Sequence, residues 1–534
     1  MKTNKLYKSL LFISILTIFS ISLSAQEAEF LKLNKSYTLH QDGSQEFRCY
    51  KELKLFTHTA MNSTYGETFI VYNPDFQELE IHDCYTKQKD GTIIKTPENA
   101  FVEVLPRFAA NAPAYNQLKE MVVVHTGLDL GSTIYLDYSI RTKAGYYPEL
   151  DIDELLQETS PILNYQISIA VPEDKTLNYL LYSSASKVNE SNKNKMKVYS
   201  WQLSNIPASS RMPYLPQNKE NIPRLTANTF RNGTDAFDFM ANRINESIAI
   251  ESETYAQFIT EEIPSSEEKL TTIHNYVVNN LSTIAIPLDY TGYNLRNADE
   301  TIRSSYGTVL EKTNLLNKML NAVEIPSEIV FYYPSTISSA NKGLTAIKQI
   351  GVKIKLNNRE QFLSATSLSP IKPEYRGSLD KVFTLKGKEI PIETTPAIFD
   401  DTVDTSIDKS LVKNGYLVYT LPPTKGFDRW HISNLNSKRT DLFEIPSAIQ
   451  DKITYCVKVP EGMELISSSD PSSITTSIGK VERLIKQEGD HLEIIKTIEL
   501  KKQQYSPNEY SDLKKLIDEW NSNKSNELLF KVSK

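Results

Sequence analysis

The chain has 534 residues, of which 40% are hydrophobic and 10% aromatic, and its formal net charge is −7. This length leaves room for about three or four domains, each with a core of its own. The mild acidity argues against a nucleic-acid partner, which calls for a basic surface.

The N-terminus has the pattern of a cleaved export signal. Three lysines within the first eight residues precede an apolar run at 10–23, and Ala25 is a small residue at a plausible cleavage point. No later stretch approaches the roughly 18 to 20 apolar residues that a membrane span requires. We therefore expect residues 1–25 to be removed. The mature chain, with 56 basic and 66 acidic residues, is expected to be periplasmic or otherwise extracytoplasmic and to have no membrane span.

Residues 26–206 are typical of a β-sandwich. Short runs rich in branched and aromatic residues, such as TFIVYN and STIYLDYSIRT, are separated by turn signals such as Asp42-Gly43 and Asp90-Gly91. The next segment, 207–233, contains four prolines between 207 and 223, which indicates an extended linker.

The chain has three cysteines, Cys49, Cys84 and Cys456. Cys49 and Cys84 lie in strand-like runs, so they could form a disulfide across a sheet; two small buried core residues are the favoured interpretation. His82 and Cys84 should share one face of a strand because side chains alternate. No second pair of ligands is in view, so a metal site is not expected.

Helical periodicity begins near residue 234. Ser265 and Glu268 form a predicted capping box at the start of SSEEKLTTIHNYVVNNL, and His274 is expected to be a packing residue. The predicted buried stripe of this helix is Leu270, Ile273, Val277 and Leu281. Strand-like segments follow residue 320, and Asn357-Asn358 predicts a hairpin turn.

Residues 401–534 return to β texture and end in a helix. Ser506-Pro507-Asn508-Glu509 predicts a capping box with proline at the first helical position. The predicted buried stripe of this helix is Leu513, Leu516, Ile517 and Trp520.

The middle of the chain, from HNYVVNN at 274 to NAVEI at 325, resembles a transglutaminase-like domain of the papain-type superfamily. The positions that match the family's pattern are Gly292, Ala298, Gly307, Glu311 and Lys312. Residues 26–205 resemble the domain of unknown function 3857, and the C-terminal part resembles the β domain that often follows. The resemblance implies an N-terminal β-sandwich, a central α+β domain at 234–400 and a C-terminal β-sandwich with a terminal helix at 401–534.

In such domains a Cys-His-Asp triad acts on acyl groups, with the thiolate at a helix N-terminus. At the matching positions this sequence has Val309, Gly351 and Ser364. No cysteine occurs within 85–455 and no histidine within 275–430, so the central segment after His274 contains no Cys-His pair. Glu324 stands where a glycine often ends the nucleophile helix.

These departures favour a non-catalytic binding or scaffolding module, with no cofactor. Val309 is expected to cap the inherited helix and to pack there, on one face with Thr313, Leu316 and Leu320. The candidate binding residues are Gly307, Thr308, Tyr290 and Tyr293, although core packing is the alternative for the tyrosines. The ligand class stays open between peptide, protein and glycan. The alternative function is a repurposed hydrolase or transferase with Thr308 or Ser305 as a non-cysteine nucleophile.

Overall fold

The computed structural model describes residues 26–433, 435–467 and 471–532, so the predicted export signal at 1–25 lies outside the described residues. The described chain forms two compact units. The first contains the residues up to Ser209 together with Ile222–Glu324 and Ser338–Ala346. The second contains Ser210–Asn221, Ile325–Ile337 and the residues from Ile347 onward. The division at 206, 233 and 400 that the sequence suggests stays a prediction.

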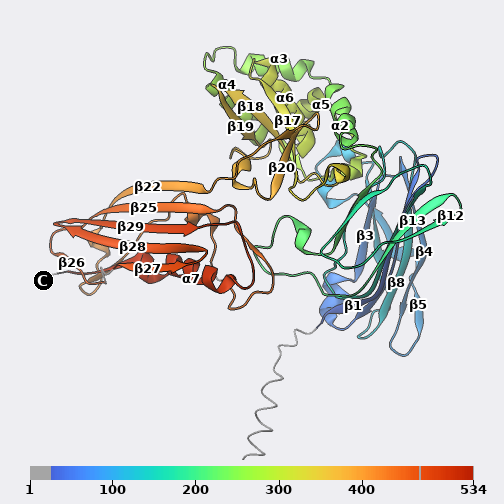
Figure 1. The fold of residues 1–534 in the computed structure, drawn as a ribbon, viewed down its shortest axis with the longest axis horizontal. Helices are drawn as coiled ribbons and strands as arrows, with labels where there is room; N and C mark the ends of the chain where they lie inside the picture. Colours follow the sequence, from blue (N-terminus) through green and yellow to red (C-terminus); the bar gives the residue numbers. More distant parts are fainter. Residues whose placement is uncertain (1–25, 434, 468–470, 533–534) are drawn as a thin grey trace, which may run out of the picture. The chain divides into compact units, whose positions relative to one another are not determined.

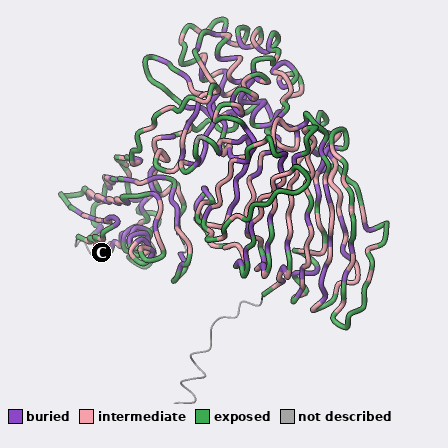
Figure 2. Tube along the Cα trace, turned by 45° about the vertical axis from the view of Figure 1, so that its right-hand side comes forward, coloured by how far each residue is buried: buried purple, intermediate pink, exposed green. Residues whose placement is uncertain are grey.

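An eight-stranded sheet dominates the first unit, in the order β12-β13-β10-β1-β2-β8-β4-β5. Its strands are β1 (Ala28–Leu39), β2 (Gln45–Leu55), β4 (Gln77–Lys87), β5 (Ile93–Lys95), β8 (Thr133–Thr142), β10 (Ile162–Pro172), β12 (Asn189–Lys193) and β13 (Met196–Ile206). Only the β1–β10 pairing is parallel within this sheet. Residues along many of these strands alternate between more and less buried positions, because successive side chains point to opposite faces (Figure 2).

Two three-stranded sheets complete the β part of this unit. One has the order β3-β7-β6, with β3 (Glu67–Tyr72), β6 (Phe101–Val104) and β7 (Lys119–Val124). The other has the order β11-β14-β9, with β9 (Asp151–Leu155), β11 (Asn178–Tyr182) and β14 (Arg224–Asn228). Trp201 of the large sheet and Leu225 of β14 belong to the same buried apolar cluster, as a sandwich requires.

The helical part of the first unit surrounds α6 (Val309–Ala322), which packs against α3, α4 and α5. The other helices are α2 (Asp235–Asn245), α3 (Ile250–Ile259), α4 (Ser266–Asn279) and α5 (Ala298–Ser304); β15 (Ser282–Ile284) and β16 (Tyr306–Thr308) form a short parallel pair. The capping box predicted for α4 is confirmed in part: the Ser265 hydroxyl accepts a hydrogen bond from the Glu268 amide, but among the described residues no reciprocal bond from the Ser265 amide to the Glu268 carboxylate completes the box. His274 is buried, as predicted.

The second unit begins with the sheet β19-β18-β17-β20-β21. Its strands are β17 (Ser327–Pro334), β18 (Gln349–Leu356), β19 (Arg359–Leu363), β20 (Asp380–Thr384) and β21 (Glu389–Ile390). The predicted hairpin turn is confirmed: Asn357 and Asn358 have φ angles of 50° and 61°, between the paired residues Leu356 and Arg359.

The rest of the second unit is a C-terminal β domain with terminal helices. Its main sheet has the order β22-β25-β29-β28-β27, with β22 (Ala397–Ser406), β25 (Ile449–Lys458), β27 (Ser472–Thr476), β28 (Gly479–Glu488) and β29 (His491–Leu500) (Figure 1). The smaller sheets are β23-β31-β26, with β23 (Tyr416–Thr420), β26 (Met463–Leu465) and β31 (Glu527–Val532), and β24-β30, with β24 (Phe443–Glu444) and β30 (Gln504–Tyr505). The helices are α7 (Tyr510–Asn521) and α8 (Asn523–Asn526).

The predicted start of the terminal helix is wrong by three residues. Ser506 and Glu509 do interact, because the Glu509 carboxylate accepts hydrogen bonds from the Ser506 amide and hydroxyl, both at 2.9 Å. However, residues 507–509 form a tight turn, and α7 begins at Tyr510 without a side-chain cap. The predicted apolar stripe of α7 is fully buried.

The predicted shared face of His82 and Cys84 is also wrong. A β-bulge between Ile81 and Asp83 shifts the pairing of β4, so His82 is exposed and Cys84 is buried. Cys49 and Cys84 are both buried and free, which confirms the core interpretation. They lie on β2 and β4, separated by β8, and two strand spacings are roughly 10 Å, too far for a disulfide.

Candidate functional site

The helix that would carry the nucleophile begins with a complete capping box. The Thr308 hydroxyl accepts from the Glu311 amide at 3.3 Å, and the Glu311 carboxylate accepts from the Thr308 amide at 2.9 Å. Thr308, and not Val309, is therefore the cap. Val309 is the first helical residue and its side chain is exposed.

The expected packing of Val309 is wrong. Its exposed fraction is 37%, whereas Thr313, Leu316 and Leu320 are fully buried. Helical spacing predicts which face a residue shares, but not where along the axis the neighbouring elements cease to cover that face. Val309 therefore presents an apolar, chemically inert side chain to solvent at the head of α6.

The Glu311 side chain stabilises the segment that precedes α6. It is fully buried, and it accepts hydrogen bonds from the Arg296 amide at 2.8 Å, from the Arg296 guanidinium at 3.1 Å and from the Tyr115 hydroxyl. The guanidinium also lies 4.4 Å from the centre of the Tyr306 ring. Burial beside the Glu311 carboxylate raises the pKa of Tyr115 well above its usual range.

Lys312 also has a structural role, because its side chain joins α6 to neighbouring segments. Its side chain is fully buried, and the ammonium group donates to the Leu281 carbonyl at 2.8 Å and to the Thr283 hydroxyl at 3.0 Å. Because neither partner is charged, burial lowers the pKa of Lys312 to about 8. The acid and the lysine that match the resemblance thus fix α6 to its neighbours.

The other predicted site positions carry no side chain of a Cys-His-Asp triad. Gly307 is buried on β16, where an added Cβ would lie 2.9 Å from the Thr301 methyl group. Val309 belongs to the first unit, whereas Gly351 and Ser364 belong to the second. Gly351 is buried on β18, and Ser364 directly follows β19, where its hydroxyl accepts from the Thr366 amide at 3.1 Å.

A Cys-His contact that the sequence did not suggest lies in the N-terminal β part. The Cys84 sulfur is 3.9 Å from Nδ1 of His125, and Nε2 of His125 is 2.8 Å from the Thr68 hydroxyl. Burial raises the pKa of Cys84 and lowers the pKa of His125 to about 3. Both groups are therefore neutral and enclosed, which is the opposite of an activated thiolate-imidazolium pair. Only the strand pairing, which sequence spacing does not show, brings them together.

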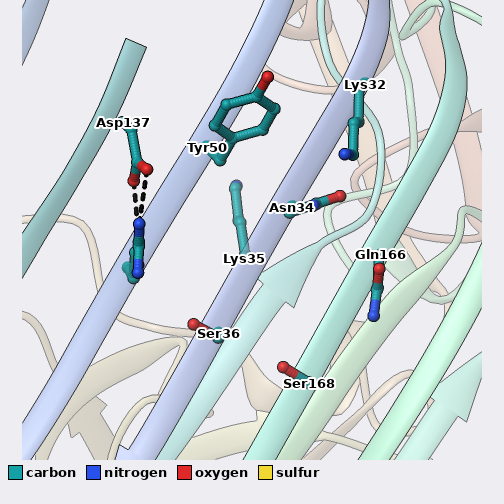
Figure 3. A pocket seen from close by; sticks show the side chains of 9 residues that line it. Lys32, Asn34, Lys35, Ser36, Tyr50, Asp137, Gln166 and Ser168 are labelled. Atoms are coloured by element: carbon teal, nitrogen blue, oxygen red, sulfur yellow. Dashed lines mark hydrogen bonds and ion pairs between the residues drawn. The ribbon is translucent and has the colours of Figure 1, made fainter. Parts of the chain in front are cut away.

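A polar groove of about 350 Å³ crosses the outer face of the large sheet (Figure 3). The Asp137 carboxylate accepts two hydrogen bonds from the Arg48 guanidinium, at 2.9 and 2.6 Å. The Lys32 ammonium lies 5.1 Å from the centre of the Tyr50 ring. These groups bind one another, so we interpret the groove as a solvated sheet face.

A second cavity, of about 410 Å³, lies within the first unit and brings together two of the predicted binding residues, Tyr290 and Tyr293. Its walls come from the inner face of the large sheet, from β3 and β9, and from the turn that contains Leu288–Thr291. Five tyrosines, two phenylalanines and six carboxylates line it, and no lysine or arginine is among its described lining residues. Gly307 and Thr308 do not line it.

The turn that carries both tyrosines is firmly held. Gly292 and Tyr293 each have a φ angle of 59°, a conformation that glycine adopts readily and other residues adopt rarely. An added Cβ on Gly292 would lie 2.6 Å from the Tyr146 ring, and the Tyr146 hydroxyl donates to the Tyr290 carbonyl at 2.7 Å. Gly292 therefore allows the turn to pass close to Tyr146.

The carboxylates of this cavity are not equivalent. Four are ion-paired to cations outside the lining: Glu46 with Arg141, Glu149 with Lys175, Asp153 with Arg224 and Glu154 with Lys35. The Asp151 carboxylate accepts from the Leu344 and Thr345 amides, at 2.5 and 3.0 Å, and burial raises its pKa to about 6. Burial also raises the pKa of Asp289, and in the described part of the chain no side chain hydrogen-bonds its carboxylate.

Comparisons with known proteins fit this architecture. The family model of a domain of unknown function with a solved structure, DUF3857, matches residues 41–210, which confirms the resemblance of the N-terminal part. The model of a second domain of this kind, DUF3858, matches residues 416–530. No curated protein is similar enough to count as a match. Within the described residues, no helix has both the length and the apolar character to cross a membrane.

Among solved structures, a putative protease from Parabacteroides distasonis ATCC 8503 is 52% identical, with a TM-score of 0.88. The match covers 95% of this chain and 99% of that protein. A putative cysteine protease from Cytophaga hutchinsonii is 12% identical over 46% of this chain and 92% of its own, with a TM-score of 0.20. An M1 zinc metallopeptidase from Deinococcus radiodurans is 10% identical over 39% of this chain and 43% of its own, with a TM-score of 0.19. The last two scores are too low to support an argument.

At 52% identity over almost the full length of both chains, this protein belongs to the same family as the Parabacteroides distasonis protein.

Proposed function

We propose that this protein is an exported, non-catalytic binding or scaffolding module whose segment 234–400 is a transglutaminase-like domain without its triad. The observation that carries the proposal is the head of α6, where Val309 is exposed at the position to which the resemblance assigns the nucleophile. A valine side chain can neither attack an acyl group nor carry a proton.

The surroundings of Val309 support the same conclusion. The Thr308 hydroxyl, the nearest alternative nucleophile, is buried and caps the helix. A serine or threonine nucleophile needs a base within hydrogen-bond reach, and the neighbouring Glu311 is already ion-paired to Arg296. The name of the Parabacteroides distasonis relative describes a protease, but these contacts favour recognition over hydrolysis for this chain.

N-terminal sequencing of the native protein tests export, and we expect the chain to begin near Gln26. Activity assays on the native protein test the non-catalytic role. We expect no incorporation of a labelled amine into a glutamine substrate and no cleavage of casein, with or without reduction of the thiols. The variant Val309→Cys should also stay inactive, because the new thiol would have no histidine base beside it in the sequence segment that the resemblance assigns to the triad. Turnover that iodoacetamide abolishes in the wild-type protein would overturn the proposal.

A further inference from the structure

We propose that the cavity beside Tyr290 and Tyr293 binds an organic cation, namely an alkylammonium or guanidinium group with apolar flanks. The inference rests on the proposed function and names the ligand class of that binding module.

The walls of the cavity are rich in aromatic rings. Five tyrosines and two phenylalanines contribute to the lining. Aromatic rings attract ammonium and guanidinium groups through their negative faces, and the attraction is greater where water is excluded. Tyr293 is only 3% exposed, and its ring meets the Tyr147 ring edge-on at 6.3 Å, so this part of the wall is packed in place.

The charge of the cavity lining favours a cation over an anion. Asp289 is half-buried, its carboxylate accepts hydrogen bonds only from backbone amides, and it has no cationic side-chain partner among the described residues, unlike the four ion-paired carboxylates of the same cavity. Partial burial of a carboxylate without a counter-charge is unfavourable, and an incoming cation would offset that cost. An anionic ligand would meet the Asp289 carboxylate, which has no counter-charge among the described residues, and no lysine or arginine in the lining.

The size and the opening fit a single basic group. A volume of about 410 Å³ lies at the small end of ordinary ligand sites. Phe69 of β3 lines the cavity and is nevertheless 57% exposed, so its ring forms part of the rim. A free amine and the basic side chain of a peptide could both present the required group, and the test separates these sources.

Calorimetric titration with matched probes tests the proposal. The first pair is n-butylguanidinium and its neutral isostere n-butylurea. The second pair is the capped tripeptide acetyl-Ala-Arg-Ala-amide and its counterpart with neutral citrulline in place of arginine. We expect each cation to bind at least about tenfold more tightly than its neutral partner. Binding of the small cation alone would indicate a free amine or guanidine, and tighter binding of the peptide would indicate a basic side chain.

Variants locate the binding. Asp289→Asn keeps the shape and removes the charge, so it should lower the affinity for the cations about tenfold and leave the neutral probes unchanged. Asp289→Glu should retain the selectivity. Phe69→Ala should weaken cation binding without lowering the melting temperature, because the ring is exposed. Asp83→Asn, at an exposed carboxylate on β4, is the matched control and should bind like the wild type.

Two outcomes would overturn the inference. Equal affinities for the cationic and neutral members of both pairs would show that the cavity does not select charge, and unchanged cation binding by Asp289→Asn would show that the cation binds elsewhere. Binding of the neutral probes alone would also contradict cation selectivity, although the protein would still be a binding module. The proposed function fails separately, through the activity assays. If Asp289→Asn does not fold, Asp289→Glu and Phe69→Ala still decide the question.

Discussion

Lys312 is a charged side chain with no exposed surface, and both of its hydrogen-bond partners are neutral. Its pKa in the folded protein is about 8, whereas an unperturbed lysine has a pKa near 10.4. Between these values the unfolded chain binds a proton that the folded chain does not. The free energy of unfolding should therefore rise as the pH increases from about 8 to 10.5.

The variant Lys312→Met isolates this effect. Methionine cannot titrate, so the difference in the free energy of unfolding between wild type and variant should change in favour of the wild type as the pH rises through this window. Urea denaturation at pH 7.5, 9 and 10 measures that difference. Lys318→Met, in the same helix, is the control and should leave the difference constant. A pH-independent difference for Lys312→Met would show that the ammonium group is not desolvated as the structure indicates.

At the scale of elements, the capping box fixes the N-terminus of α6. Thr308→Ala removes the hydroxyl that accepts from the Glu311 amide, so it should cost about 1 kcal/mol of stability, whereas Thr308→Ser should cost much less. Chemical denaturation gives both values. Because Thr308 does not line the cavity, the affinity of Thr308→Ala for n-butylguanidinium should equal that of the wild type. A loss of affinity at unchanged stability would instead restore the sequence-based hypothesis of a site at the helix head.

Local signals in the sequence were sufficient for several short elements, although the one at Ser506 placed the start of α7 three residues too early. The cap at Ser265 and the hairpin at Asn357-Asn358 follow from short-range hydrogen bonds and backbone preference. Glu324 has a φ angle of 63°, so the chain ends α6 with a left-handed residue even without the glycine found in the resembling domains.

Features that depend on the fold could not be predicted in this way. The bulge near His82 and the exposure of Val309 arise from neighbours distant in sequence. The cavity is a similar case. The sequence pointed to Tyr290 and Tyr293 as aromatic residues, but most of the carboxylates that line the cavity belong to β9 and its flanks, more than a hundred residues away.

At the scale of the whole molecule, the two compact units have separate apolar cores. Ile167 lies in the core of the N-terminal β part, and Ile494 lies in the core of the C-terminal β domain; both are fully buried. Because the chain forms two units with distinct cores, we expect calorimetry to show two unfolding transitions in place of one.

Two core substitutions assign these transitions. Ile167→Ala should cost about 2 to 5 kcal/mol and lower the midpoint of one transition by several degrees, while the other midpoint stays in place. Ile494→Ala should do the reverse, so each variant is the control for the other. Cation binding is a third marker: n-butylguanidinium should raise only the midpoint that Ile167→Ala lowers, because a ligand stabilises the unit that holds its cavity. A single transition that both substitutions lower equally would mean that the two units unfold as one cooperative body.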